Sequence, residues 1–587
     1  MRSGAMDTLN GLRSDDGGAR RRASIGAFEE HAGGSAGSLV SRGRLVEQLR
    51  GRRIIPRDIT LLLVAVLVAS AVIFALPLGR RPFDNQDEAR YSLLARAAVE
   101  HGQWILPRVR DEVYLNKPPL YFWTVALFAL PFGTVTDATA PIASVVSAVV
   151  GLGAVFAIGR LLWGPGAGLA AVVILATSPF YFFMAHQVLT DMMLTAWLSW
   201  GLYFYLAAGR MRYAMKPLVA FYLCTAGGLA SKGPAALMVV LAALVATVVA
   251  DGWRGIRRLR LPLGLGLIVL TALPWILLYV LQGERSYGRS VLMKEYVLWY
   301  FASSVASRLG ALLGHFGRFL PWGFFLLPAA WWWARDRQEG RTRLLVWAGT
   351  LAAVLLVSGE QRARYFLPLW PICALLVADF WVNGAERAHL LLARTATVFL
   401  GGTIGVAIYV IRGFASGSAA VFLPAGTAER WVLSSALVAG AALALLSLHR
   451  QQSGAVAAGC VAAGLGVVLA VTAVGYPPRF ARAHDFPGAA RRVATRLEAA
   501  DPLLAYPDAS LSWDFYLRRP VRELEDEGEA MALLAAAPRV RLLMRAGDWY
   551  RLKRQANPAW RTLDEGQVGR RHFILVGACG SGEVCDP

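Results

Sequence analysis

Residues 59–91 read ITLLLVAVLVASAVIFALPLGRRPFDNQDEARY, and this stretch decides the class of fold. The apolar run 59–79 is long enough to cross a bilayer, which requires about 20 such residues. A polar segment, Asp84 to Tyr91, follows it directly, and a second, Tyr114 to Leu120, lies a short way along the chain. Carboxylates, an arginine and a lysine gathered beside the first span of a hydrophobic chain indicate a membrane enzyme that acts on charged headgroups.

The composition indicates a polytopic membrane protein. Hydrophobic residues make up 56% of the 587 residues and charged residues only 17%. A net charge of +21 would suggest a nucleic-acid partner in a soluble chain. Here the arginines cluster between apolar runs, which is the pattern of cytoplasmic loops and of contact with anionic membrane lipids. We therefore predict membrane lipids and no nucleic acid as partners.

Thirteen apolar runs predict thirteen membrane-spanning helices. They cover 59–79, 139–159, 167–185, 191–208, 217–231, 235–250, 261–282, 317–334, 344–358, 365–382, 389–411, 430–448 and 454–475. A further run, Pro118–Phe132, is short and begins with two prolines, so we expect a juxtamembrane or re-entrant element there. The expected fold is an all-α polytopic membrane domain.

The charges of the loops predict the topology. If Pro118–Phe132 does not cross, the arginine-rich loops, such as Arg254–Arg260 and Arg335–Arg343, all fall on one side. The positive-inside rule places that side in the cytoplasm, with the N-terminus inside and the C-terminus outside. The chain then divides into a disordered cytoplasmic tail (1–57), a transmembrane catalytic domain (58–476, with its first outer loop at 80–133) and an outer domain (477–587).

The outer domain is expected to be a small α/β domain. Short apolar runs at Leu503–Ala505, Leu542–Met544 and Phe573–Val576 predict strands, and Ala489–Ala499 has a helical pattern. The domain serves either to dock an acceptor or simply to stabilise the fold.

The five cysteines show no metal-binding spacing, and we predict no metal and no cofactor. Cys224, Cys373 and Cys460 fall in apolar segments, where they are expected to be packing residues. Cys579 and Cys585 can form a disulfide if the C-terminus lies in an oxidising compartment.

Under this topology five polar segments face outward, which is the arrangement of a catalytic cavity. They are 84–117, 186–191, 231–234, 283–315 and 358–365. The first predicts a helix that begins near Asp87, sets Arg90 and Tyr91 over that carboxylate, and ends at Gly102.

Individual residues of these polar segments can also be explained by structure alone, without a catalytic role. Lys117 precedes Pro118 and Pro119, which disfavour helical geometry before them and so direct its ammonium group toward a phosphate. It can equally be a lysine that reaches the membrane surface from a helix end. Asp191 can be an N-terminal helix cap, and Lys232 can belong to a plain turn before a proline-initiated helix.

Taken in order, the motifs resemble the GT-C glycosyltransferases that use polyprenyl-phosphate sugars. They are Asp87-Glu88-Ala89-Arg90-Tyr91, Lys117-Pro118-Pro119-Leu120, Thr190-Asp191, Lys232-Gly233-Pro234, Leu273-Pro274-Trp275 and Arg364-Tyr365-Phe366-Leu367-Pro368. The branch they are most similar to transfers 4-amino-4-deoxy-L-arabinose to lipid A, and the protein O-mannosyltransferases are more distant. Trp513–Pro520 is similar to the periplasmic domain of that branch.

The resemblance implies a fold, substrates and roles. It implies about thirteen spans with a periplasmic C-terminal domain in the bacterial inner membrane, an undecaprenyl-phosphate sugar as donor and lipid A or another periplasmic acceptor. Asp87 would be the catalytic carboxylate, and Lys117 and Arg90 would bind the donor phosphate, to which chemistry adds Lys232 and Arg364. The residues expected to line the substrate cavity are Glu88, Tyr91, Asn116, Asp191 and Tyr365. The family commonly has an acidic residue where this chain has Asn116.

Two mechanisms follow from this assignment. With a hydroxyl acceptor, Asp87 would act as general base for inverting in-line attack. With a lipid A phosphate, the acceptor is already anionic, and Asp87 would orient it and stabilise positive charge on the sugar.

Other functions stay open. Related transferases with a different sugar or acceptor (protein, surface glycan, hopanoid lipid) share these motifs. From another class, a secondary transporter would require internal repeats and charges at the membrane midplane, and the sequence shows neither.

Overall fold

The computed structural model describes residues 57–83, 85–105, 108–110, 112–114, 116–281, 310, 314–315, 317–335, 338–357, 362–412, 426–498, 501–507, 510–524, 526–536, 540–569 and 571–578. The chain divides into two units, Met1–Thr60 and Leu61–Pro587, and the architecture below is that of the second. The expected tail, Asp84, most of the segment 283–315, and Cys579 and Cys585 lie outside the described residues.

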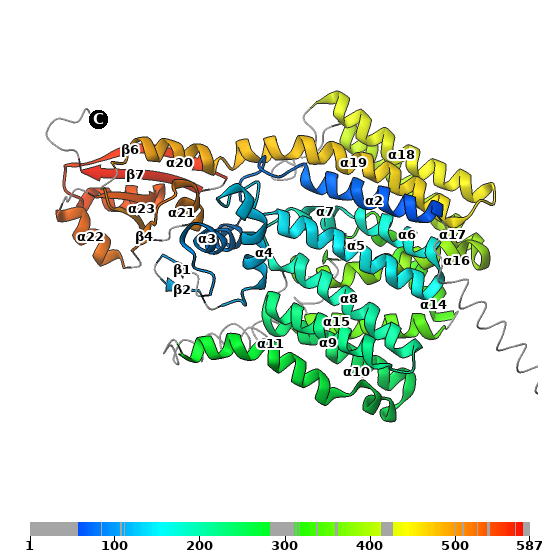
Figure 1. The fold of residues 1–587 in the computed structure, drawn as a ribbon. Coiled ribbons are helices and arrows are strands. Elements are labelled where there is room, and N and C mark those ends of the chain that lie inside the picture. Colours follow the sequence, from blue (N-terminus) through cyan, green and yellow to red (C-terminus); the bar gives the residue numbers. More distant parts are fainter. Residues whose placement is uncertain are drawn as a thin grey trace, which may run out of the picture. The chain divides into compact units, whose positions relative to one another are not determined.

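Helices form most of this unit (Figure 1). They are α2 (Arg57–Ala75), α5 (Ile142–Trp163), α6 (Pro165–Ala176), α7 (Pro179–Ala185), α8 (Thr190–Arg210), α9 (Met215–Lys232), α10 (Met238–Asp251), α11 (Leu261–Leu281), α14 (Leu326–Arg335), α15 (Glu339–Val357), α16 (Trp370–Arg387), α17 (His389–Arg412), α18 (Thr427–His449) and α19 (Gly454–Ala483). Short 3₁₀ turns are η1 (Leu130–Phe132), η2 (Gly233–Leu237), η3 (Trp253–Leu259), η6 (Trp322–Phe325) and η7 (Ala363–Leu369). Each of the thirteen expected runs overlaps a helix, with α6 and α7 sharing one run, so the helical prediction is confirmed.

The number of crossings depends on how broken helices are counted. Among the described residues, eight helical stretches are long and apolar enough to cross a membrane, or nine if α6 and α7, bent by 71°, form one span. One of the eight, Met215–Asp251, holds both α9 and α10. The Tyr213 hydroxyl before α9 donates to the Asp251 carboxylate at the end of α10, so the two helices run antiparallel and form two of the expected runs.

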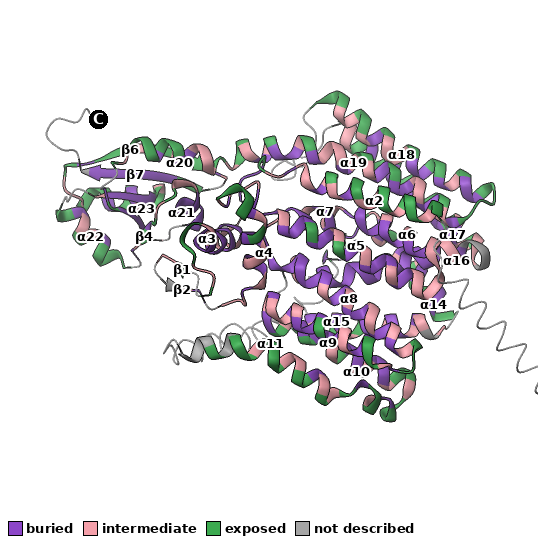
Figure 2. Ribbon diagram, in the orientation of Figure 1, coloured by how far each residue is buried: buried purple, intermediate pink, exposed green. Residues whose placement is uncertain are grey.

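The helices pack through small residues, and outer helices such as α18 carry many exposed residues (Figure 2). A Cβ built on Gly159 would lie 2.6 Å from Gly168 Cα, and one on Gly440 would lie 2.8 Å from the Cys460 carbonyl oxygen. Such close approach is the usual packing mode in lipid, where no hydrophobic force pulls apolar helices together. Leu61 and Val398 keep 61% and 62% of their surface exposed, as expected of side chains that face lipid tails.

The first long loop folds into α3 (Gln86–His101), the hairpin β1 (Arg108–Val109) and β2 (Glu112–Val113), and α4 (Leu120–Ala129). The Asn85 side chain caps α3 by accepting from Glu88 N at 3.1 Å, and Gly102 ends the helix with φ +67°. The predicted helix from near Asp87 to Gly102 is therefore confirmed. The ten residues of α4 fall short of a bilayer's thickness, as expected for Pro118–Phe132.

The C-terminal domain is a five-stranded sheet with helices on both faces. Its strands are β3 (Leu503–Tyr506), β4 (Arg522–Glu523), β5 (Arg541–Arg545), β6 (Trp560–Val568) and β7 (Arg571–Ala578), in the order β4-β3-β5-β7-β6. The register pairs Leu504 with Leu542 in parallel and Leu543 with Leu575 antiparallel. The predicted α/β character is confirmed.

Alternate residues of these strands build two cores. Leu543 and Leu575 pack with Val493 and Trp513 from α20 (Phe486–Thr495) and α21 (Leu511–Leu517). On the other face, Leu542 and Ile574 pack with Leu534 and Trp549 from α22 (Glu527–Ala536) and α23 (Ala546–Leu552). This is the period of two that a sheet buried on both faces requires.

The same domain packs against α3. The Arg96 guanidinium lies 3.9 Å from the ring centroid of Phe515 in α21 and donates to the Phe515 carbonyl at 2.9 Å. Nearby, Arg110 pairs with Asp514 at 2.8 Å and with Glu523 at 2.7 Å. Contacts from the C-terminal domain thus hold the helix that carries Asp87. Arg96 and Phe515, which form one of these contacts, are 419 residues apart in the sequence.

Candidate active site

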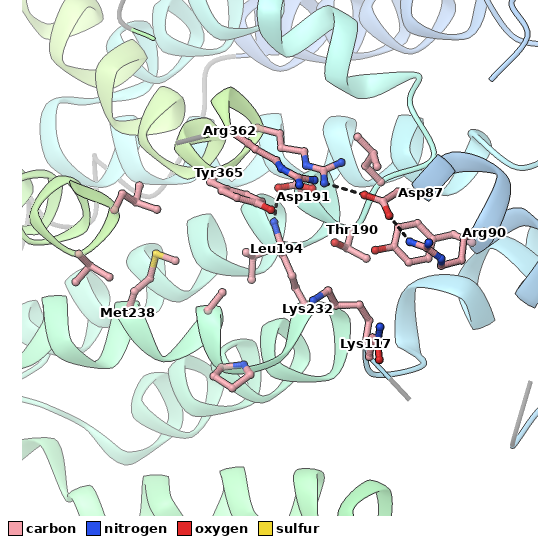
Figure 3. Close-up of a pocket in the computed structure, with 18 of the residues that line it drawn as sticks. Asp87, Arg90, Lys117, Thr190, Asp191, Leu194, Lys232, Met238, Arg362 and Tyr365 are labelled. Carbon is pink, nitrogen blue, oxygen red and sulfur yellow. Dashed lines mark hydrogen bonds and ion pairs between the residues drawn. The ribbon is translucent and has the colours of Figure 1, made fainter. Parts of the chain in front are cut away.

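Two cavities meet at the N-terminal end of α3. The first has a volume of about 320 Å³ and is lined by Asp87, Arg90, Tyr91, Tyr114, Asn116, Lys117, Leu189, Thr190, Asp191, Leu194, Lys232, Pro234, Ala235, Met238, Val354, Leu355, Arg362, Arg364 and Tyr365. Figure 3 shows Asp87, Asp191 and Lys232 in this cavity, with Tyr365 and Arg362 beside them. Five cations and two carboxylates are among its lining residues, so its electrostatic potential suits an anion.

Asp87 lies between two arginines. Its Oδ1 accepts from Arg90 Nη1 at 2.6 Å, and its Oδ2 accepts from Arg364 Nη2 at 2.8 Å. Burial alone would raise the pKa of Asp87, but the charges of Arg364, Arg90 and Arg362 outweigh burial and hold that pKa below its ordinary value. Asp87 is therefore a stable carboxylate and a weak base.

Arg364 has hydrogen-bond donors that its ion pair with Asp87 does not use. Its Nε is buried and has no hydrogen-bond partner within the described part of the chain. A buried guanidinium donor without a partner is costly unless a ligand oxygen satisfies it. Because the side chain lines the cavity, this nitrogen is suited to a phosphate or a sugar oxygen.

A second ion pair joins Lys232 to Asp191. Lys232 Nζ donates to Asp191 Oδ1 and lies 4.5 Å from the ring centroid of Tyr365. The N-cap position of α8 is Leu189, whose side chain makes no capping hydrogen bond, so Asp191 serves this pair and is not a cap. Three segments far apart in sequence, 190–191, 232 and 364–365, thereby meet at one site.

The remaining cavity residues come from the segment before α4. Asn116 and Lys117 line the first cavity together with Tyr91 and Tyr114. Burial raises the pKa of both tyrosine hydroxyls, with the Asp87 charge adding to it, so each stays a neutral hydrogen-bonding group. Nine of the ten predicted site residues therefore share one cavity.

Glu88 is the exception. It does not line the cavity because its side chain is fully buried on the other side of α3. Arg81 holds it with two hydrogen bonds, at 2.6 and 3.2 Å, and Val188 N donates to it at 3.0 Å. One residue along a helix turns a side chain by about 100°, which separates the two adjacent carboxylates.

Sequence reasoning missed several residues that line the site. Tyr114 and Arg362 fall within the polar segments 84–117 and 358–365, where no local pattern indicates a role for them. Arg318, which lines the second cavity, lies in an apolar run with no motif around it, so no local signal marks it. Among the described residues, no group of three His, Cys, Asp or Glu side chains is arranged to hold a metal ion.

The other predicted features can be placed as well. Cys224, Cys373 and Cys460 are free. The expected packing role is confirmed for Cys224 and Cys373, which are buried, whereas Cys460 is half-buried. Pro274 of the Leu273-Pro274-Trp275 motif lies inside α11. His186 is buried beside Phe182, with 4.9 Å between the ring centroids.

Several known proteins resemble this chain in sequence or in fold. The family model for dolichyl-phosphate-mannose-protein mannosyltransferases matches residues 116–278. An undecaprenyl phosphate-alpha-4-amino-4-deoxy-L-arabinose arabinosyl transferase of Pectobacterium atrosepticum is 25% identical over 519 residues, which cover 80% of this chain and 89% of that protein. Its counterpart in Pectobacterium carotovorum is 27% identical over 345 residues, covering 55% and 59%. Among solved structures, ArnT from Cupriavidus metallidurans bound to undecaprenyl phosphate superimposes with a TM-score of 0.72 at 21% identity, over 89% of this chain and 98% of that one.

The chain therefore has the fold of the GT-C class of multi-pass membrane proteins. Within that class, the chain is similar to the aminoarabinose arabinosyl transferases over four fifths of its length.

Proposed function

We propose that this protein transfers a 4-amino-4-deoxy-L-arabinose-type sugar from undecaprenyl phosphate to lipid A at the periplasmic face of the bacterial inner membrane. The observation that carries the proposal is the set of five cations that line the same cavity as Asp87. The helical bundle around it exposes large apolar side chains, as a membrane protein does. The likeness to the arabinosyl transferases supports the choice of donor and sugar. The arginine-rich loops support a topology in which the C-terminal domain and the cavity lie outside.

The donor phosphate is assigned to the first cavity. Lys117, Arg90 and Arg364 all line this cavity, and Arg364 Nε has no hydrogen-bond partner within the described residues. Lys232 adds positive charge, although its pairing with Asp191 suggests that it mainly positions that carboxylate. Apolar walls from Leu194, Met238 and Leu355 suit the first isoprene units of the carrier.

The chemistry is a displacement at the sugar C1. An oxygen of the acceptor phosphate supplies the electron pair of the new C1–O bond, and the old bond from C1 to the donor phosphate oxygen breaks. The electron pair of the broken bond leaves with undecaprenyl phosphate. A monoester dianion and a diester monoanion become a diester monoanion and a monoester dianion, so charge balances and no proton moves.

The cations and Asp87 have separate tasks in this step. Lys117, Arg90 and Arg364 stabilise the charge that grows on the departing phosphate. Asp87, clamped between two arginines, is poorly suited to remove a proton, and this favours a phosphate acceptor over a hydroxyl acceptor. Its carboxylate then holds both guanidinium groups in place and stabilises positive charge that develops on the sugar ring.

Mass spectrometry of lipid A tests the proposal. Cells that express the protein should contain lipid A carrying one added aminopentose, and cells with Asp87→Asn should not. Glu498→Gln is the control, since Glu498 is exposed in the C-terminal domain and lines neither cavity. An unmodified lipid A spectrum in cells with well-expressed wild-type protein would assign the enzyme to another acceptor.

A further inference from the structure

The hairpin β1–β2 precedes part of the wall of the first cavity. Tyr114 directly follows β2, and it lines this cavity together with Asn116 and Lys117. Figure 1 shows the hairpin beside α3, the helix that carries Asp87. The two strands have two residues each and form a two-stranded sheet. Because an isolated two-stranded hairpin is at best marginally stable in water, contacts from outside must hold this one in place.

The C-terminal domain binds the hairpin through Arg110, the residue directly after β1. Arg110 Nε and Nη2 donate to the two carboxylate oxygens of Asp514 at 3.0 and 2.8 Å, and Nη1 donates to Glu523 at 2.7 Å. A guanidinium that meets one carboxylate through two hydrogen bonds is fixed in orientation as well as in position. The side chains of Arg110 and Asp514 are 19% and 5% exposed, so solvent screens this ion pair only weakly.

Both carboxylates are anchored within their own domain. The Asp514 side chain, on α21, also accepts from Val521 N at 3.0 Å. Glu523 lies on β4, which pairs with β3 in the five-stranded sheet. Arg110 is therefore attached to the folded core of the C-terminal domain, and the position of that core fixes the end of the hairpin.

The backbone of Arg110 depends on the same contacts. Its φ is +55°, in the left-handed region that residues other than glycine rarely adopt. A conformation of this kind persists when the surrounding contacts over-determine it, as the three hydrogen bonds to Asp514 and Glu523 do here. Loss of these bonds releases the backbone toward the conformations that an arginine ordinarily prefers.

We propose that Arg110 is a positioning residue of the donor site, through which the C-terminal domain sets the place of Lys117. This inference rests on the proposed function, in which Lys117 binds the donor phosphate. It gives the C-terminal domain a part in donor binding, beyond the acceptor docking or plain stabilisation that the sequence suggests for it.

The connection from Arg110 to the cavity is short. Lys117 lies four residues after Val113, the end of β2, and a chain of that length reaches at most about 14 Å. Tyr114, within this stretch, is buried, and the Arg90 guanidinium lies 6.0 Å from its ring centroid. A displacement of the hairpin therefore reaches the wall of the cavity within a few residues.

The far end of the same loop is held by α4. Trp123 Nε1, in α4, donates at 2.5 Å to the carbonyl of Trp104, which closely follows α3. A shift of the hairpin is therefore taken up by the residues that precede α4, and these include Tyr114 and Lys117. Removing the Arg110 ion pairs thus changes the distance between Lys117 and the cations on α3 and η7.

Binding of undecaprenyl phosphate gives the first test. Wild type, Arg110→Gln, Arg110→Lys and Asp514→Asn are reconstituted in nanodiscs, and Asp514→Asn keeps an oxygen that can accept from Val521 N. The control Arg522→Ala removes an exposed ion pair in the same domain. We expect Arg110→Gln to weaken binding by about three- to tenfold, with a change in the same direction in Asp514→Asn and partial rescue in Arg110→Lys. The control should bind like wild type.

A double variant separates positioning from general stabilisation. Arg110→Gln with Lys117→Ala should bind undecaprenyl phosphate as weakly as Lys117→Ala alone, because the place of a side chain has no further effect once that side chain is removed. Hydrogen exchange, measured by mass spectrometry, should be faster in Arg110→Gln for peptides that contain Val113 and Tyr114, and unchanged in Arg522→Ala.

Three results would each overturn the positioning role. They are unchanged exchange in Arg110→Gln, faster exchange with unchanged affinity, and a double variant in which the losses from Arg110→Gln and Lys117→Ala multiply. If Arg110 and Lys117 were coupled in binding but no sugar reached lipid A, the proposed function would fail and the positioning role would stand.

Discussion

The neighbouring carboxylates Asp87 and Glu88 should respond to substitution in opposite ways. Asp87 lies at the cavity junction with 22% of its side chain exposed, whereas Glu88 is fully buried in an ion pair with Arg81, whose side chain is 5% exposed. We predict that Glu88→Leu lowers the stability of the protein strongly, and that Asp87→Asn abolishes transfer with little change in stability.

The expected magnitude follows from the buried contacts. Glu88→Leu leaves the Arg81 guanidinium without the carboxylate that accepts its two hydrogen bonds at 2.6 and 3.2 Å. Removing one partner of a buried ion pair typically costs about 3–5 kcal/mol. The Val188 amide loses its acceptor as well, which adds about 1–3 kcal/mol if it stays unpaired. At Asp87, partly exposed and beside a polar cavity, the change should stay below about 1 kcal/mol.

A double variant separates charge pairing from packing. Arg81→Leu with Glu88→Leu removes both charges and takes the partners from the Val188 amide and the Pro82 carbonyl. Its unfolding free energy should fall by about 1–3 kcal/mol for each group that stays unpaired, which is well below the sum of the two single variants. The measurement is unfolding by a denaturing detergent in mixed micelles, for wild type, both single variants and the double variant. If the double variant lost as much stability as the two singles summed, the two side chains would not be coupled and the buried ion pair would not be what holds α3 in place.

Three further predictions concern the site and its support. Lys117→Ala should weaken binding of undecaprenyl phosphate by about tenfold or more while Lys117→Arg retains most of it, as measured by equilibrium binding; equal affinity in wild type and Lys117→Ala would remove this lysine from the donor subsite. Because Arg364 and Arg90 hold the pKa of Asp87 below 3.8, its carboxylate stays ionised until the pH falls through that lowered value, so transfer rates should show no acid limb from Asp87 between about pH 5 and about pH 8. An infrared band of a protonated carboxyl group that appears in that pH range in wild type and is missing in Asp87→Asn would contradict the double pairing. Arg96→Ala removes a buried guanidinium that donates to the Phe515 and Val135 carbonyls, so both kcat and thermal stability should fall. The control Arg522→Ala removes an exposed ion pair with Glu529 in the C-terminal domain and should leave both quantities unchanged.

Much of the fold followed from the sequence because its signals are local. Apolar runs of bilayer length marked the helices, and Asn85 and Gly102 lie where the capped helix α3 begins and ends. Short apolar runs marked β3, β5 and β7 because a sheet covered on both faces leaves continuous hydrophobic stretches in its strands.

Some arginines had a different environment from the one that their sequence context indicated. Arg341 and Arg343 counted as loop charges, yet both are buried, Arg341 against Asp379 at 2.7 Å and Arg343 against Asp251 at 3.1 Å. A partner that lies 38 or 92 residues away leaves no mark on the local pattern.

The sequence by itself determined that this is a polytopic membrane protein with a terminal α/β domain, and which charged motifs to examine, because hydrophobic period and residue type are properties of short segments. The tertiary structure alone decided which carboxylate faces substrate. Asp87 and Glu88 are adjacent, but a helical step of about 100° points one at Arg364 and the cavities and the other at Arg81 and the core. It also decided that Arg318 lines the cavity next to Asp87, because the neighbouring Phe319 stacks on Trp370 and Arg318 itself lies over the ring of Phe180.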